Sequence, residues 1–218
     1  MALEIKRNTI ARVVMIDAYL RKKKDQFWFF LLQRWKNKLL FIKPNYITLI
    51  GLLIGLICIY WIVLEKYSIA LTFWILNRIV DGLDGVIARL NDQQTDFGGY
   101  IDIIFDFIVY SGIIVALTYV NRSEDLIILT GLILVSIYYV NAISWSYLAG
   151  LLIKRSNNTD KITSLDVPTS IIEGVETIFF YILFIVLTDY LAVLFSVFSF
   201  LIFCSIMQRI WFAHAQLK

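Results

Sequence analysis

Six long apolar runs, separated by short polar connections, occupy almost the whole chain after Pro44. A helix that spans a bilayer needs about 20 mostly apolar residues, and runs of this kind lie at residues 47–64, 67–90, 98–120, 125–153, 167–187 and 190–214. The chain is 60% hydrophobic and only 17% charged, which excludes a soluble globular protein. We therefore expect an all-α, polytopic integral membrane protein, with six transmembrane helices in one domain over residues 44–218.

The segment before the first run, residues 1–43, forms a separate basic region. It holds eleven of the chain's 20 Lys and Arg residues against three acidic residues, a net charge of +8. Residues 26–41 combine such charges with aromatic side chains, which suit the headgroup level of a bilayer. We expect a cytoplasmic interfacial amphipathic helix there, with a flexible basic tail as the alternative. Because no nucleic-acid-binding motif accompanies the charge, we expect no nucleic-acid partner.

Basic residues in the connections predict how the helices are oriented. Cytoplasmic loops carry the excess of Lys and Arg. With the N-terminus inside, the cytoplasmic side holds the basic N-terminal segment and five further residues: Arg89, Lys154, Arg155, Lys161 and Lys218. The opposite side holds Lys66 and Arg122. We therefore expect both termini in the cytoplasm, together with the junction between the second and third helices.

Four aspartates gather at this junction. Asp81 and Asp84 lie near the end of the second predicted helix, and Asp102 and Asp106 lie in the first turns of the third. Residues three or four apart share a helix face, so each pair presents its carboxylates together. Carboxylates at membrane depth are costly unless a cation or an aqueous cavity compensates them. Two facing pairs of carboxylates predict a site with oxygen ligands for one or two hard cations, Mg²⁺ or Mn²⁺.

The residues around the aspartates extend the pattern. Arg89 supplies a cation suited to a phosphate oxygen, and nearby glycines leave room for a bulky ligand, as phosphoryl transfer requires. Residues 81–106 read D-x-x-D-G-x-x-A-R-x8-G-x3-D-x3-D, which resembles the signature of the CDP-alcohol phosphotransferases at every specified position. The resemblance extends to the six-helix layout, the interfacial helix and the sequence Pro44-Asn45-x-x-Thr48, so it covers most of the chain.

The resemblance implies a role for each matched residue. The four aspartates would build a two-metal centre, and Asp106 would also be the general base that takes the proton from the attacking alcohol. Six residues would bind the CDP moiety: Asn45, Thr48, Gly85, Ala88, Arg89 and Gly98. For Asn45 and Thr48 a cap at the start of the first helix is the alternative. The implied reaction releases CMP, and the implied assembly is a homodimer.

The signature does not disclose which alcohol attacks. Glu173 and Glu176 of the fifth predicted helix share a face, and Arg209 lies in the sixth. Our hypothesis is that these three residues face the cavity and hold a polar acceptor. A structural pairing between the glutamates and the arginine is an equally weighted alternative. Asn141 and Ser144 are further polar candidates in the fourth helix.

Several functions are compatible with these features. The favoured one is a membrane phosphatidyltransferase of phospholipid biosynthesis, which moves a phosphatidyl group from CDP-diacylglycerol to a small polar alcohol. Transfer from CDP-choline or CDP-ethanolamine to diacylglycerol is the alternative within the same chemistry. An ion or proton transporter is less favoured, because all four aspartates cluster at one depth instead of following a path through the bilayer. A non-catalytic scaffold is also less favoured, because the signature is intact.

Overall fold

The computed structural model describes residues 44–156 and 170–217, and all the regular structure within them is helical. Six α-helices occupy these residues: α3 (Pro44–Val63), α4 (Tyr67–Leu90), α5 (Asp96–Val120), α6 (Asp125–Ser156), α7 (Gly174–Val186) and α8 (Leu191–Gln216). A single 3-10 turn, η2 (Thr188–Tyr190), precedes α8. The all-helical prediction is therefore confirmed, and α4 has the predicted bounds. The predicted interfacial helix at 26–41 lies outside the described residues.

The fifth predicted helix begins later than expected. The prediction placed its start at residue 167, whereas α7 begins at Gly174. Glu173 is the N-cap residue and forms a capping box with Glu176, in which each side chain accepts a hydrogen bond from the other residue's backbone N–H. This reciprocal cap satisfies two donors at the start of α7 and sets the position at which the helix begins.

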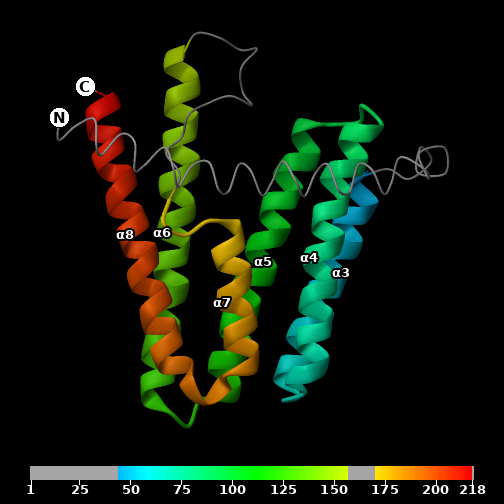
Figure 1. The fold of residues 1–218 in the computed structure, drawn as a ribbon, viewed down its shortest axis with the longest axis vertical. Helices are drawn as coiled ribbons and strands as arrows, with labels where there is room; N and C mark the ends of the chain where they lie inside the picture. Colours follow the sequence, from blue (N-terminus) through cyan, green and yellow to red (C-terminus); the bar gives the residue numbers. More distant parts are fainter. Residues whose placement is uncertain (1–43, 157–169, 218) are drawn as a thin grey trace.

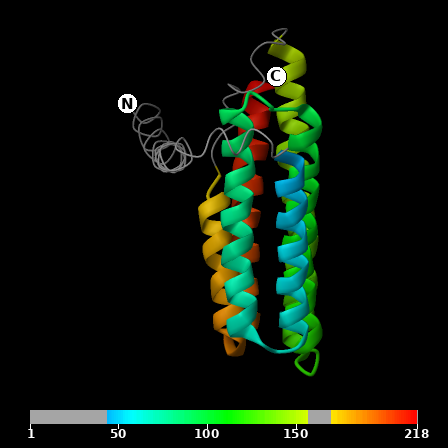
Figure 2. The ribbon, with the colours of Figure 1, turned by 90° about the vertical axis from the view of Figure 1, so that its right-hand side faces the viewer.

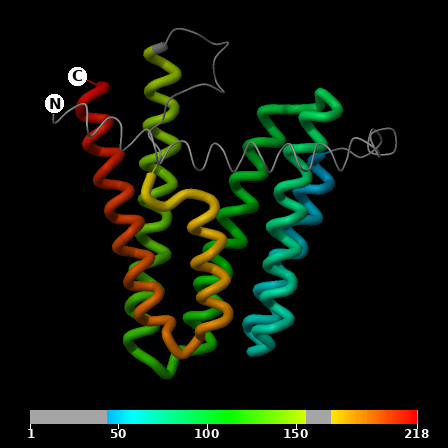
Figure 3. The backbone as a smooth tube through the Cα atoms, in the orientation of Figure 1, coloured from blue at the N-terminus to red at the C-terminus, as the bar shows by residue number. Residues whose placement is uncertain are grey.

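Successive helices run in opposite directions along one bundle. The start of α3, the α4–α5 turn and the C-terminal ends of α6 and α8 lie at one end of the bundle (Figure 1), and the tube view shows the same arrangement (Figure 3). Seen from the side, α3 and α4 run next to each other along their length (Figure 2). Helix α3 packs on α4 and α5, while α6 packs on α8.

Aromatic side chains fill the centre of the bundle. Trp74 of α4 is fully buried and stacks on Tyr181 of α7, with ring centroids 5.2 Å apart. Phe180 of α7 stacks in the same way on Phe198 of α8, at 4.6 Å. Aromatic pairs at such distances add to the stability that burial already supplies. The core therefore ties α4 and α7 to α8.

Four of the six helices have the length and composition of membrane spans. They cover Pro44–Val63, Asp96–Val120, Asp125–Arg155 and Thr188–Gln216. Helix α4 differs because it carries four charged side chains: Arg78, Asp81, Asp84 and Arg89. Helix α7 has 13 residues, about 20 Å at 1.5 Å per residue, which is shorter than a hydrocarbon core of about 30 Å. The count of six spans stays a prediction.

Candidate active site

A tight turn between α4 and α5 brings the two halves of the aspartate motif together. Within it, Asp92 adopts a left-handed backbone conformation, with φ 51°, which aspartate tolerates better than most residues. Thr95 then caps α5, because its hydroxyl accepts a hydrogen bond from the backbone N–H of Gly98 at 3.0 Å. As a result Asp84 and Asp102 line the same cavity.

The start of α3 closes this site from a third side. The Thr48 hydroxyl donates a 2.8 Å hydrogen bond to Asp84 Oδ2, and the backbone N–H of Gly85 donates one of 2.5 Å to Oδ1. Thr48 also lies 3.3 Å from the Pro44 carbonyl oxygen, so it bonds to its own helix as well as to the motif. Asn45 Oδ1 would lie 3.1 Å from a Cβ placed on Gly98. Glycine at position 98 thus keeps a space that a side chain would fill.

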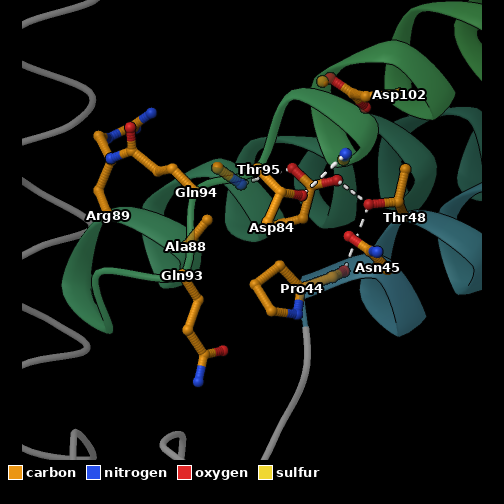
Figure 4. A pocket seen from close by; sticks show the side chains of 13 residues that line it. Pro44, Asn45, Thr48, Asp84, Ala88, Arg89, Gln93, Gln94, Thr95 and Asp102 are labelled. Carbon is orange, nitrogen blue, oxygen red and sulfur yellow. Dashed lines mark hydrogen bonds between the residues drawn. The ribbon is translucent and has the colours of Figure 1, made fainter.

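A cavity of about 240 Å³ lies between these three segments, and we call it the nucleotide cavity after the moiety that is predicted to bind there. All six residues predicted to bind the CDP moiety line it: Asn45, Thr48, Gly85, Ala88, Arg89 and Gly98. Figure 4 shows Asp84 between the side chains of α3 and those of the α4–α5 turn. Gln93, Gln94 and Thr95 of the turn also line the cavity, and the motif did not predict them because they fall within its unspecified positions. The structure brings the predicted residues together, and their roles stay predictions.

A second, smaller cavity is shared by the four aspartates. Asp81, Asp84, Asp102 and Asp106 all line it, and its volume of about 10 Å³ corresponds to roughly one water-sized sphere. In the described parts of the chain, no group of three or more His, Cys, Asp or Glu side chains stands close enough to hold a metal ion without moving. The donor set, however, consists of carboxylates alone, which are the ligands that Mg²⁺ and Mn²⁺ prefer. The donors fit a hard divalent ion, and closing on one requires the side chains to shift.

Arg78, which the sequence pattern did not single out, contacts two of these aspartates. Its Nη2 donates a 2.8 Å hydrogen bond to Asp106 Oδ1, and its Nη1 lies 3.5 Å from Asp81 Oδ2. A signal was present, because an arginine inside a mostly apolar run is costly unless it has a partner, and Asp81 follows it by one helical turn.

The three residues of the predicted acceptor pocket lie elsewhere, and none of them lines the two cavities above. Arg209 is buried and donates hydrogen bonds to Asn141 Oδ1 at 2.6 Å and to the Ser144 and Ser170 hydroxyls at 3.0 and 2.6 Å. Glu173 and Glu176 cap α7, and Glu173 also accepts a 2.8 Å hydrogen bond from the Ser170 backbone N–H. Ser170 therefore links the capping glutamate to the arginine.

Comparison with known proteins identifies the family. The family model described as CDP-alcohol phosphatidyltransferase matches residues 41–211. The chain is 29% identical over 179 residues to "Inner membrane protein YnjF" of Escherichia coli (strain K12). That match covers 81% of this chain and 85% of that protein. The chain is 35% identical over 65 residues to "Archaetidylinositol phosphate synthase" of Pyrococcus horikoshii. That match covers 30% of this chain and 35% of that protein.

A third relative adds a similar, shorter match. The chain is 31% identical over 85 residues to "Bifunctional IPC transferase and DIPP synthase" of Thermococcus kodakarensis, which covers 39% of this chain and 19% of that protein. The apolar helices together with the family match make the chain an integral membrane protein. The family match confirms the resemblance found in the aspartate signature: the chain belongs to the CDP-alcohol phosphatidyltransferase family.

Proposed function

We propose that the protein transfers a phosphatidyl group from CDP-diacylglycerol to a small polar alcohol and releases CMP. The observation that carries this proposal is the cavity of about 240 Å³, in which the residues of the nucleotide signature meet two of the motif's carboxylates. Membership of a phosphatidyltransferase family supports the reaction class. A relative whose name refers to synthesis of an inositol phosphate lipid supports a phosphorylated polyol as one acceptor to test.

The residues of the cavity suit the nucleotide half of the substrate. Arg89 places a guanidinium at the cavity wall, and this group matches the oxygens of a phosphate. Gly85 lies under that guanidinium, since a Cβ there would be 3.3 Å from Arg89 Nη1. A Cβ on Gly98 would lie 3.0 Å from Thr95 Oγ1 and 3.1 Å from Asn45 Oδ1, so these two side chains already occupy the space beside Gly98. Glycine at both positions therefore lets polar side chains of the cavity wall lie close to the backbone, where the nucleotide phosphates would bind.

The reaction needs a base and a charge-neutralising group. In our proposal the acceptor oxygen attacks the phosphorus that carries diacylglycerol, the bond from that phosphorus to the oxygen of CMP breaks, and Asp106 takes the hydroxyl proton. Asp81, Asp84, Asp102 and Asp106 would hold two Mg²⁺ or Mn²⁺ ions. Such ions, when bound, neutralise developing negative charge and make the hydroxyl more acidic.

We propose two different roles for the predicted acceptor residues. In this proposal Arg209 contacts the acceptor: its guanidinium is hydrogen-bonded to neutral groups of Asn141, Ser144 and Ser170, and these partners leave its positive charge available to an anionic acceptor. Glu173 and Glu176 act indirectly, since their capping box begins α7 beside Ser170. The glutamates then shape the pocket without touching the alcohol.

We also propose that the chain crosses the membrane six times and assembles as a homodimer. In the orientation that the charge distribution predicts, the interfacial helix and both termini lie on the cytoplasmic side. The arrangement of the bundle supports a common face, because the α4–α5 turn and the ends of α6 and α8 lie together (Figure 1). Arg89, Lys154 and Arg155 belong to that end, and excess basic charge is typical of the cytoplasmic side.

The decisive experiment measures CMP release by purified protein in nanodiscs. CDP-diacylglycerol and Mg²⁺ or Mn²⁺ are supplied with glycerol 3-phosphate, inositol, inositol phosphate, serine or phosphatidylglycerol in turn. Asp106→Asn should abolish acceptor-dependent release. Asp125→Asn is the matched control, because Asp125 is an exposed aspartate in the first turn of α6, and it should release CMP like the wild type. A folded wild-type protein that is silent with every acceptor, and also with CDP-choline and diacylglycerol, rejects the proposal.

A further inference from the structure

Arg78 lies in the middle of α4 and is almost completely enclosed, with its side chain 8% exposed. Burying a guanidinium in a membrane protein is costly unless every donor finds a partner. The nucleotide cavity does not include this residue, and the family signature begins three positions after it. Neither the nucleotide cavity nor the signature therefore accounts for the burial of Arg78.

Each nitrogen of the guanidinium has a partner. Nε and Nη2 donate to Asn77 Oδ1 at 2.9 and 2.6 Å, and Nη1 donates to the Tyr110 hydroxyl at 2.7 Å. Nη2 also donates to Asp106 Oδ1 at 2.8 Å. Asn77 is itself fixed, because its Nδ2 donates a 2.7 Å hydrogen bond to the Gly51 carbonyl oxygen of α3. The guanidinium thus bonds directly to groups of α4 and α5, and through Asn77 it is also tied to α3.

Two aromatic rings, those of Trp74 and Tyr110, lie against the guanidinium. Its central carbon lies 4.8 Å from the ring centroid of Trp74 and 4.8 Å from that of Tyr110, within the range of cation–π attraction. Tyr110 is held in turn by Tyr181, whose hydroxyl donates to the Tyr110 carbonyl oxygen at 3.1 Å. The hydrogen bonds and the two rings together restrict how the guanidinium can turn.

This fixed cation contacts one aspartate from each half of the motif. It binds Asp106 of α5 through Oδ1, and among the described residues the second oxygen of Asp106 has no hydrogen-bond partner. It also lies 3.5 Å from Asp81 of α4. Both aspartates line the small cavity that the four carboxylates share. One group therefore contacts two of the four carboxylates that line that cavity.

We infer that Arg78 is a positioning residue of the transferase site, which orients Asp106 and Asp81 toward the shared cavity through its planar set of donors. This inference rests on the proposed function. A role in charge compensation alone would be met by any cation, including lysine. Positioning instead requires the fork of Arg78, since a lysine ammonium cannot reach Asn77, Tyr110 and Asp106 in one plane.

The test compares Arg78→Lys, which keeps the charge, with Arg78→Gln, which removes it. Tyr110→Phe is a milder variant, since it keeps the ring and deletes only one acceptor of the guanidinium. Arg122→Lys is the matched control, because Arg122 also stacks on a tyrosine, with its guanidinium carbon 4.5 Å from the Tyr119 ring centroid, but is exposed. Three quantities are measured on folded, monodisperse protein: kcat and KM for CMP release from CDP-diacylglycerol, Mn²⁺ affinity by electron paramagnetic resonance, and the Tm.

We expect Arg78→Lys and Arg78→Gln alike to lower kcat and weaken Mn²⁺ binding by about 10- to 100-fold, the usual effect of losing a group that orients metal ligands. KM for CDP-diacylglycerol should stay close to the wild-type value, because Arg78 does not line the nucleotide cavity. Tyr110→Phe should show a smaller loss of the same kind. Arg122→Lys should match the wild type in all three measurements.

Two results overturn the inference. One is an Arg78→Lys protein with wild-type kcat and Mn²⁺ affinity, since charge would then suffice. The other is a set of Arg78 and Tyr110 variants with a lower Tm but with wild-type kcat and Mn²⁺ affinity per folded molecule. The arginine would then only stabilise the fold. If the wild type turns over no substrate, the proposed function fails, and Mn²⁺ affinity alone decides the inference. A wild type that binds no Mn²⁺ overturns it as well.

Discussion

A hydrogen bond of 2.8 Å from the Thr48 hydroxyl to Asp84 Oδ2 connects α3 to the aspartate motif in α4. Both side chains are buried, at 7% and 6% exposure, and both line the nucleotide cavity. A buried carboxylate that loses a donor bears the cost of its desolvation without compensation. Thr48 therefore contributes to the orientation of Asp84 as well as to the packing of α3, and the alternative of a simple helix cap does not account for this bond.

We expect Thr48→Val to lower the free energy of unfolding by about 1.5–3 kcal/mol, the usual worth of a hydrogen bond to a charged group. Valine keeps the shape of the side chain, so packing should change little. KM for CDP-diacylglycerol should rise, because Asp84 forms part of the cavity wall. Unfolding in detergent and steady-state CMP release measure the two effects.

Thr130→Val is the control for this variant. Thr130 has the same exposure, 7%, and in the described structure its hydroxyl bonds to the Leu126 and Ile127 carbonyl oxygens of its own helix. Those carbonyls keep their backbone partners without the hydroxyl, so Tm and KM should stay near their wild-type values. Equal losses of stability in both valine variants, with KM unchanged in both, would contradict a specific role for the Thr48–Asp84 bond.

At the scale of elements, α3 is held in place by close contacts with both of its neighbours. On the α4 side, the Gly51 carbonyl oxygen accepts the hydrogen bond from Asn77. On the α5 side, Gly55 faces Val109 so closely that a Cβ would overlap the valine side chain. Small residues allow helices to approach closely within a membrane. Because α3 carries Asn45 and Thr48, these contacts also position one wall of the site.

Gly55→Ala should therefore destabilise the protein by about 1–3 kcal/mol, as expected when a packed contact is overfilled. The double variant Gly55→Ala/Val109→Ala should recover part of that loss, because the two residues are in direct contact. Gly51→Ala is the control in the same helix, since its Cβ would lie 3.7 Å from Val80 Cγ1, an ordinary contact. Unfolding in detergent measures these three variants and Val109→Ala alone. A double variant that loses as much stability as the two single variants together would count against the contact.

The capping box of α7 makes a separate prediction about the glutamates. Glutamine can replace glutamate in a capping box, so Glu176→Gln should keep both the Tm and CMP release. Glu176→Ala removes the acceptor that Glu173 N–H uses at 3.1 Å, and it should cost about 1 kcal/mol of stability. A Glu176→Gln protein with wild-type Tm and no CMP release would instead show that this carboxylate contacts the acceptor.

At the scale of the whole molecule, the sequence predicted most where a pattern is local. The bounds of α4 follow from an apolar run that ends in polar residues, and the family resemblance carried by the aspartate motif implied the six residues that line the nucleotide cavity. The start of α7 was missed because its N-cap is Glu173, whereas Ser, Thr, Asp and Asn are the usual N-cap residues. The role of Arg78 depends on Tyr110 and Asp106 of another helix, a contact that no local pattern contains.

The two ends of the bundle differ in charge, and this difference predicts which end faces the cytoplasm. Arg89, Lys154 and Arg155 lie at the end that holds the nucleotide cavity, while Lys66 and Arg122 lie at the other. Single cysteines at Ser123, in the α5–α6 turn, and at Gln216, at the end of α8, sample the two ends. They are placed in a background with Cys58 and Cys204 replaced by alanine.

A membrane-impermeant maleimide applied to intact cells should label Ser123→Cys, and it should label Gln216→Cys only after the membrane is opened. The reason is the preference of Lys and Arg for cytoplasmic connections, from which we expect the nucleotide cavity to lie on the cytoplasmic side. CMP release by each variant confirms that the labelled molecules are folded. The reverse labelling pattern would place the cavity outside, and labelling of both positions from one side would contradict a bundle whose α8 crosses the membrane.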